Sequence, residues 1–137
     1  MKGQACQIEH DVANKSKLTL NNEIGFKCLH YSVAESSGRV KIAVQNKLNL
    51  PQTVGVKTLE DSAVEGEDFE ALDVQLTIPP LSQKSVLVKI KDDEGWEPDE
   101  DFFVYLYDPN DNDKKQLYGD NTRTKVTILD DDKPGTF

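Results

Sequence analysis

From Phe26 onward, apolar and polar residues alternate with a period of two, which is the pattern of strands with one buried face. Runs of turn-forming residues such as Glu35-Ser36-Ser37-Gly38 separate the alternating segments. No convincing helical pattern interrupts them. The pattern therefore predicts seven short strands, at residues 26–34, 39–45, 52–59, 72–78, 85–91, 101–107 and 122–129.

Short strands at this spacing, with turn signals between them and no helix, indicate an all-β fold. We expect a seven-stranded antiparallel β-sandwich of the immunoglobulin-like type. The sixth strand shows how its faces divide. Its core residues are predicted to be Phe102, Val104 and Leu106, and its outer-face residues Phe103, Tyr105 and Tyr107.

Residues 1–25 lack this alternation and contain many poor strand formers, so we interpret them as an N-terminal tail. The tail can be partly ordered, because four apolar residues could pack an extra strand or turn onto the domain: Ile8, Val12, Leu18 and Leu20. The remaining residues, 26–137, form the predicted single domain.

The net charge of the 137-residue chain is −9, from 25 acidic and 16 basic residues. This balance argues against a nucleic-acid partner, because basic patches supply the affinity for phosphates. An acidic balance fits either cation binding or plain solubility. The clustering of the acids in a few segments favours cation binding.

The two cysteines, Cys6 and Cys28, are too few for a disulfide scaffold, although a single bridge between them stays open. Reduced thiols are expected if the domain is cytosolic. No stretch reaches the roughly 20 apolar residues of a membrane span, and residues 1–5 lack the apolar core of a signal peptide. We therefore expect no direct insertion into a membrane.

The acidic segments are predicted to meet at one end of the sandwich. In an antiparallel sandwich successive loops alternate between the two ends. The first-to-second, third-to-fourth and fifth-to-sixth loops thus share an end with the close of the seventh strand. Nine carboxylates converge there: Glu35, Asp68, Asp92, Asp93, Glu97, Glu100, Asp130, Asp131 and Asp132.

Nine carboxylates at one end repel one another unless they take up protons or bind cations. Two unit charges about 4 Å apart repel by roughly 4 kcal/mol at an effective dielectric constant near 20. Ca²⁺ is the suitable cation, since it accepts about 6–8 oxygen ligands in irregular geometry, whereas Mg²⁺ requires a compact octahedron. Zn²⁺ would favour His or Cys, and His10 and His30 lie outside these loops. Adjacent aspartates can bridge ions, so several Ca²⁺ ions are expected. The competing interpretation is a solvated acidic surface.

Four sequence segments resemble the Calx-β motif of calcium-binding domains. They are Gly66-Glu67-Asp68-Phe69-Glu70, Val88-Lys89-Ile90-Lys91-Asp92-Asp93, residues 97–106 (EPDEDFFVYL) and Val126-Thr127-Ile128-Leu129-Asp130-Asp131-Asp132. The close of the chain, Asp130 to Phe137, resembles the end of the first regulatory domain in the cytosolic loop of Na⁺/Ca²⁺ exchangers. The resemblance covers roughly residues 26–137.

The resemblance implies an immunoglobulin-like sandwich that binds Ca²⁺ at one tip through the nine carboxylates named above. It adds Gly95 as a position where the family uses a backbone carbonyl. It also implies a sensor on the cytoplasmic side of a membrane exchanger, whose transmembrane part and second tandem domain after Phe137 would be its partners. The glycine-rich run that the family usually carries in the third-to-fourth loop is absent from Glu60 to Glu65.

Two other classes of function were weighed against the sensor. Calx-β domains also occur in adhesion and matrix proteins, where Ca²⁺ stiffens the link between domains. An enzyme is the weakest alternative, since no nucleophile elbow, P-loop or HExxH pattern is present. Residues 108–119 also fail as an EF-hand loop, because Asp113 stands where that loop requires glycine.

Overall fold

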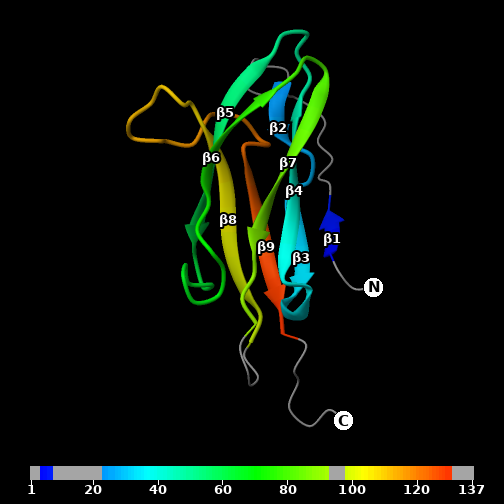
Figure 1. Ribbon diagram of the computed structural model, residues 1–137, viewed down its shortest axis with the longest axis vertical. Helices are drawn as coiled ribbons and strands as arrows, with labels where there is room; N and C mark the ends of the chain where they lie inside the picture. Colours follow the sequence, from blue (N-terminus) through cyan, green and yellow to red (C-terminus); the bar gives the residue numbers. More distant parts are fainter. Residues whose placement is uncertain (1–3, 8–22, 93–97, 131–137) are drawn as a thin grey trace.

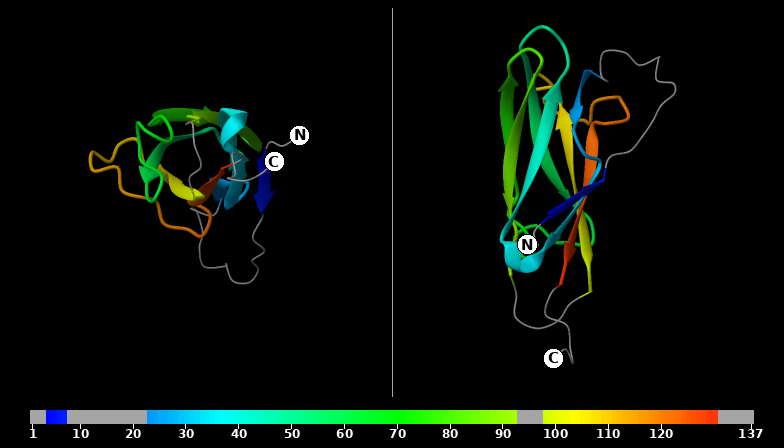
Figure 2. Two further views of the ribbon diagram at one scale, coloured as in Figure 1. Left: turned by 90° about the horizontal axis from the view of Figure 1, so that it is seen from below. Right: turned by 90° about the vertical axis from the view of Figure 1, so that its right-hand side faces the viewer.

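The computed structural model describes residues 4–7, 23–92 and 98–130 of the chain. Its strands run along the long axis of the molecule and form two packed layers (Figure 1 and the right view of Figure 2). The all-β sandwich is confirmed, but the strand count differs from seven. The described residues form nine strands: β1 (Gln4–Gln7), β2 (Ile24–Phe26), β3 (His30–Ala34), β4 (Arg39–Asn46), β5 (Gln52–Glu60), β6 (Asp73–Ile78), β7 (Ser82–Lys89), β8 (Glu100–Tyr107) and β9 (Arg123–Leu129).

One layer is a six-stranded sheet in the order β1-β3-β9-β8-β5-β6, and the other is a three-stranded sheet in the order β2-β4-β7. Neighbouring strands are antiparallel except for β3 and β9, which are parallel. β1 comes from the predicted tail and pairs with β3 at the edge of the larger sheet. The residues Ile8, Val12, Leu18 and Leu20 lie outside the described part, and the division of the chain at residue 25 stays a prediction.

The first strand expected at 26–34 is two strands in different sheets. Residues 27–29 carry the chain across the sandwich: the Lys27 N–H donates to the Ala43 carbonyl of β4, whereas the Leu29 carbonyl accepts from the Lys125 N–H of β9. Cys28, within this crossing, is buried and disulfide-bonded.

The core lies between the two layers and is built mostly from alternating strand residues, with Cys28, Ala63 and Phe69 added from connecting segments, whereas Val74 and Leu76 of β6 are only partly buried. Val40, Ile42 and Val44 of β4 belong to the same core cluster as Phe102, Val104 and Leu106 of β8, and all six are fully buried. Burial of this kind contributes about 25 cal/mol per Å² of apolar surface and holds the two sheets together.

Tyr107 lies on the outer face of its sheet, as predicted, yet it is only 2% exposed. Its ring lies over Gly55 of the neighbouring strand, where an added Cβ would come within 2.2 Å of the Tyr107 Cζ atom. The loop 108–121 also folds back along the sheet, with the Leu117 N–H bonded to the Leu106 carbonyl.

Candidate metal site

One end of the sandwich, at the bottom of Figure 1, holds the last residues of β3, β7 and β9 and the start of β8. The first acidic residue there is Glu35, which opens a short 3₁₀ helix (Glu35–Ser37) directly after β3. Gly38 ends this helix with a φ of 81°, a conformation that glycine adopts without strain. Its carbonyl accepts a 2.9 Å hydrogen bond from the Ile90 N–H. The helix is thereby fixed against the exit of β7, and Glu35 is 6% exposed.

Asp68 is positioned by the loop between β5 and β6. Gly66 makes the turn with a φ of 91°, and its N–H donates to the Phe69 carbonyl at 2.7 Å. The Oδ2 atom of Asp68 accepts the Val64 N–H at 2.7 Å. The Asp68 carbonyl accepts the Lys91 N–H at 2.9 Å, which ties this loop to the residues after β7.

Phe69 anchors the same loop in the core. Its side chain is fully buried and stacks on Phe102, with the ring centroids 4.0 Å apart and the planes 12° from parallel. Offset-stacked aromatic pairs contribute about 0.5–1.5 kcal/mol beyond the area that they bury. Because Phe69 is held in this way, the preceding Asp68 is held at the end of the sandwich.

Glu100 and Asp130 reach this end from adjacent strands. Glu100 opens β8 and pairs in register with Ile128 of β9. Asp130 follows β9 directly and is 9% exposed. Its N–H makes a long hydrogen bond, 3.4 Å, to the Oδ1 atom of Asp99. The strand pairing thus brings together two carboxylates that are 30 positions apart in the chain.

These four acidic residues line one small cavity of about 10 Å³, which has room for roughly one water-sized sphere. The complete lining is Glu35, Asp68, Lys91, Pro98, Glu100, Ile128 and Asp130. The structure therefore brings Glu35, Asp68, Glu100 and Asp130 together from four separate segments, at the end of the sandwich that loop alternation predicts.

The cavity is rich in oxygen atoms of the kind that bind hard cations. Four carboxylates surround it, and Lys91 is the one cationic side chain in its lining. The Lys91 Nζ atom donates to the Gly66 carbonyl at 2.9 Å. Glu35 makes a further polar interaction, while its buried Oε1 atom accepts no hydrogen bond within the described residues. In residues 23–92 and 98–130, no three acidic, His or Cys side chains already stand in a metal-coordinating arrangement.

The other predicted ligands are placed as follows. Asp92 is exposed just after β7 and is not in the cavity lining. Five residues lie outside the described part of the chain: Asp93, Gly95, Glu97, Asp131 and Asp132.

Sequence reasoning missed Lys91 and Asp99 as neighbours of the cavity. Lys91 continues the alternation of β7 on the same side as Lys89, so the pattern predicts that its side chain faces the solvent. Asp99 acts on its neighbour Asp130 through the backbone N–H, and no sequence motif signals such a contact. The available signal was their position in the sequence, because Lys91 directly precedes the predicted ligand Asp92 and Asp99 directly precedes the predicted ligand Glu100.

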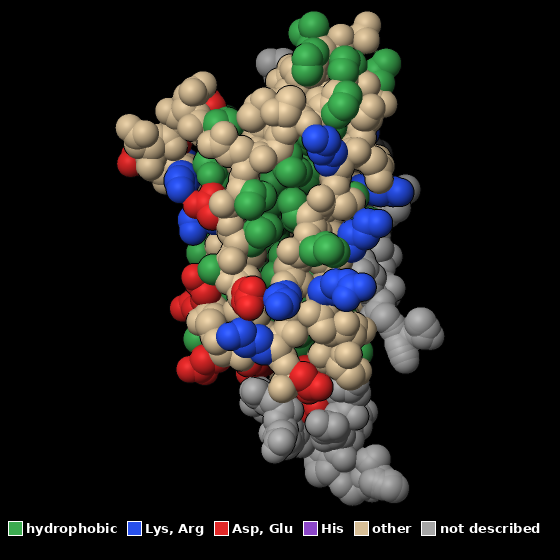
Figure 3. Space-filling view, in the orientation of Figure 1, with side chains coloured by type: hydrophobic (Ala, Val, Ile, Leu, Met, Phe, Trp, Pro, Cys, Tyr) green, Lys and Arg blue, Asp and Glu red, His purple; other side chains and the backbone are tan. Residues whose placement is uncertain are grey.

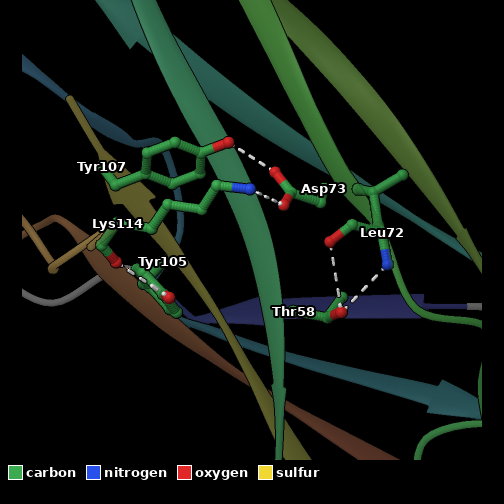
Figure 4. A network of polar contacts seen from close by, with 6 residues as sticks. All are labelled: Thr58, Leu72, Asp73, Tyr105, Tyr107 and Lys114. Atoms are coloured by element: carbon green, nitrogen blue, oxygen red, sulfur yellow. Dashed lines mark hydrogen bonds and ion pairs between the residues drawn. The ribbon is translucent and has the colours of Figure 1, made fainter. Parts of the chain in front are cut away.

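A second polar cluster lies on the outer face of the larger sheet and is paired internally (Figure 4). Asp73 accepts hydrogen bonds from the Tyr107 hydroxyl at 2.5 Å and from the Lys114 Nζ at 2.6 Å. Desolvation raises the pKa of Asp73, but the hydrogen bonds from Lys114 and Tyr107 outweigh it, so that the pKa is lowered. Desolvation together with Asp73 raises the pKa of Tyr107 to about 12. These contacts fix the 108–121 loop to the sheet and give the cluster a structural role.

Comparison with known proteins finds a matching domain family and a relative. The Calx-beta domain family matches residues 19–132. The sodium/calcium exchanger Calx of Drosophila melanogaster is 30% identical over 111 residues, which are 79% of this chain and 11% of that protein. The chain thus spans about a tenth of that curated relative.

Two solved structures show the same fold. The crystal structure of the calcium binding domain CBD12 of CALX1.1 has a TM-score of 0.69 and 28% identity, covering 80% of this chain and 46% of the other. The apo-form Calx CBD1 domain has a TM-score of 0.69 and 27% identity, covering 80% of this chain and 96% of that domain. In the described residues, no helix has the length and hydrophobicity of a membrane crossing.

Proposed function

This chain belongs to the Calx-beta domain family, and from that premise we propose that it is the Ca²⁺-binding regulatory domain of a Na⁺/Ca²⁺ exchanger. The observation that carries the proposal is the cavity at the end of the sandwich, where four segments each supply one acidic residue. The names of the similar proteins, an exchanger and its calcium binding domains, support the same function.

The four residues that line the cavity are the first proposed ligands: Glu35, Asp68, Glu100 and Asp130. Ca²⁺ suits this set because it accepts monodentate or bidentate carboxylates in irregular arrangements. The neighbouring acidic runs complete the proposed coordination of several ions, through Asp92, Asp93, Glu97, Asp131, Asp132 and the carbonyl of Gly95. Lys91 lies among these groups, so its ammonium must remain on the Gly66 carbonyl or move outward when Ca²⁺ enters.

Binding of Ca²⁺ would neutralise the repulsion between the carboxylates and hold the acidic segments together. Asp130 directly follows β9, so coordination there would act on the direction of the chain that comes after it. We propose that this junction, after Phe137, transmits the signal to a second tandem domain and to the transmembrane part of the exchanger, on the cytoplasmic side. The proposed role is binding and regulation, without catalysis.

One observation favours a second candidate, a Calx-beta module of an extracellular adhesion or matrix protein. Cys28 is disulfide-bonded, and disulfides persist mainly in oxidising compartments. In such a module Ca²⁺ would stiffen the link between domains. Affinity separates the two functions, because sensors bind Ca²⁺ near micromolar concentrations and extracellular modules bind nearer 0.1–1 mM.

Thermal unfolding of metal-stripped protein at graded Ca²⁺ concentrations tests the proposal. A ligand at 100 times its dissociation constant stabilises the folded state by about 2.7 kcal/mol, so the melting temperature should rise by several degrees. The Glu35→Gln variant should lose most of this rise, and Asp113→Asn, an acidic residue outside the cavity, should keep it. A melting temperature that does not change in millimolar Ca²⁺ would overturn the proposal.

A further inference from the structure

The end of the sandwich opposite the acidic cavity carries two neighbouring loops, 47–51 between β4 and β5 and 79–81 between β6 and β7. Two leucines protrude from them: Leu50 is 62% exposed and Leu81 is 66% exposed. Exposed prolines flank both, at positions 51, 79 and 80. Hydrophobic side chains accordingly gather at the top of the molecule in Figure 3. We call these two loops the apolar tip.

A buried asparagine holds the apolar tip in shape. Asn46 is 1% exposed, and its Nδ2 atom donates to the carbonyls of Leu50, Ile78 and Pro79 at 2.8, 3.1 and 3.1 Å. Its Oδ1 atom accepts the Leu48 N–H at 2.9 Å. The two loops are thus joined to one side chain, and Leu50 and Leu81 point outward from a fixed support.

The backbone at Leu81 is strained for the residue that stands there. Its φ is 54°, in the left-handed region where non-glycine residues are uncommon. Glycine or asparagine would adopt this conformation at lower energy. A large apolar residue in a strained and exposed position contributes little to the stability of the domain.

The strands behind the apolar tip are basic, although the chain as a whole is acidic. Residues 39–57 and 74–91 contain no Asp or Glu. Glu23 borders them, with its carbonyl accepting the Lys47 N–H at 2.7 Å. The basic residues of these segments are Arg39, Lys41, Lys47, Lys57, Lys84, Lys89 and Lys91.

Most of these residues belong to β4, β7 and the tip, and Lys and Arg side chains line this face in Figure 3. Arg39 is paired in register with Lys89, and Lys41 with Leu87. Like charges at directly paired positions destabilise a sheet, so an anionic partner would relieve this pair. Leu87, which is paired with Lys41 and lies two residues before Lys89, is 55% exposed. We call Arg39, Lys41, Lys47, Lys84 and Lys89 the basic face.

A groove of about 330 Å³ joins the apolar tip to the basic face. Polar side chains of the two strands, together with Lys47 and Leu81, form its lining: Gln45, Asn46, Lys47, Leu81, Ser82 and Gln83. The Asn46 amide and the Ser82 hydroxyl are already bonded to loop carbonyls, so the Gln45 and Gln83 amides and the Lys47 ammonium group are the polar groups of the groove that suit a phosphate-bearing headgroup, and the apolar rim suits the acyl region next to it.

We propose that the apolar tip and the basic face dock onto the surface of an anionic phospholipid bilayer. The lysines and the arginine meet the negative headgroups, one headgroup enters the groove, and Leu50 and Leu81 reach the boundary of the acyl chains. An acidic protein would satisfy the charges, but the two protruding leucines also call for an apolar layer directly beside the anionic groups. A bilayer accounts for both.

The docking is peripheral and differs from a membrane span. The sequence predicts no direct insertion into a membrane, and the proposal changes that prediction only for the side chains of Leu50 and Leu81. It does not rest on calcium binding, because the acidic cavity lies at the other end of the domain (Figure 1). Arg39 and Lys89 lie at the acidic end of β4 and β7, next to the bond between the Ile90 N–H and the Gly38 carbonyl, so the domain would lie along the bilayer on its basic face, with the cavity at the edge of the contact.

Sedimentation with lipid vesicles, in the presence of EDTA, tests the proposal. The protein should bind vesicles of phosphatidylcholine with about one-third phosphatidylserine and should not bind pure phosphatidylcholine. Lys84→Glu should lower the partition coefficient at least about fivefold, since one basic residue near an anionic surface has roughly this effect. Lys115→Glu, which changes the net charge equally but lies in the 108–121 loop, should leave the partition coefficient unchanged.

A double variant separates docking of the tip from simple charge attraction. Leu50→Ser with Leu81→Asn should lower the partition coefficient on the order of tenfold. The unfolding midpoint should stay the same or rise, since asparagine relieves the strain at residue 81. Leu59→Ser, at the acidic end, is the control and should bind as the unchanged protein does. Equal binding to neutral vesicles, no binding to anionic ones, or full binding by the double variant would overturn the proposal. Equally strong binding to polyglutamate would indicate an acidic protein surface instead.

Discussion

Replacing Tyr107 by Phe is the sharpest test of how the polar cluster on the outer face joins β8 to β6 across β5. The substitution removes one hydroxyl and keeps the ring in its place over Gly55. The hydroxyl donates to the Asp73 carboxylate at 2.5 Å, from a side chain that is 2% exposed. The variant therefore removes one charge-assisted hydrogen bond and changes little else in the packing.

The magnitude follows from the partner and its exposure. A hydrogen bond to a charged group contributes about 1.5–3 kcal/mol to stability. The Asp73 side chain is 33% exposed and also pairs with Lys114, so water can replace part of what is lost. We expect the free energy of unfolding to fall by about 1–2 kcal/mol.

Urea unfolding at neutral pH measures this loss. The midpoint should fall by about 0.5–1.5 M with an unchanged m-value, because the surface exposed on unfolding stays the same. Tyr105→Phe is the matched control, since its hydroxyl donates to the neutral Lys114 carbonyl at 3.1 Å and should contribute about 0.5–1 kcal/mol. A Tyr107→Phe variant that is as stable as the Tyr105→Phe variant would refute the reasoning.

Three further predictions concern the same sheet and the site loop. The pKa of Asp73 is lowered in the folded protein, so its ionised form stabilises the fold at pH values above the unfolded pKa near 3.8. In urea titrations, the difference in free energy of unfolding between the unchanged protein and Asp73→Asn should be constant at pH 5–7. This difference should disappear as the pH falls below about 4. Gly55→Ala should cost about 1–3 kcal/mol, because the new Cβ would meet the Tyr107 ring, and an unchanged urea midpoint would contradict this. Phe69→Leu loses the stack on Phe102 and should lower stability by about 1–3 kcal/mol; it should also reduce the rise in melting temperature with Ca²⁺, and an undiminished rise would show that Phe69 does not position Asp68.

The sandwich and most of its core were predictable from the sequence because alternation reports directly which side of a strand is buried. Val40, Ile42 and Val44 illustrate this, as all three are fully buried. The change of sheet at residues 27–29 was not predictable from the same signal. Both sheets require alternating residues, so a strand that passes from one to the other keeps its pattern.

Tyr107 shows a second limit of the pattern. The alternation of side chains along β8 correctly places Tyr107 on the outer face. Its burial, however, depends on Gly55 in another strand and on a loop that returns over the sheet. These contacts join residues that are distant in the chain. No local period can report them.

The gathering of the acidic residues was predictable because loop alternation depends only on the order of antiparallel strands. The division of the first strand did not alter the end at which Glu35 emerges, so Glu35, Asp68, Glu100 and Asp130 still meet. The lysine in the cavity lining was not predictable, since the direction of the Lys91 side chain is set by the Gly66 carbonyl in another loop.

Calorimetric titration of metal-stripped protein with Ca²⁺ tests the central proposal most directly, beside an Asp130→Ala/Asp131→Ala variant and a Mg²⁺ titration. The account predicts several Ca²⁺ sites near micromolar affinity, weakened in the variant, with little heat from Mg²⁺. Binding only near 0.1–1 mM would favour the extracellular module. No binding of Ca²⁺ at all would contradict the account and leave the acidic end as plain surface charge.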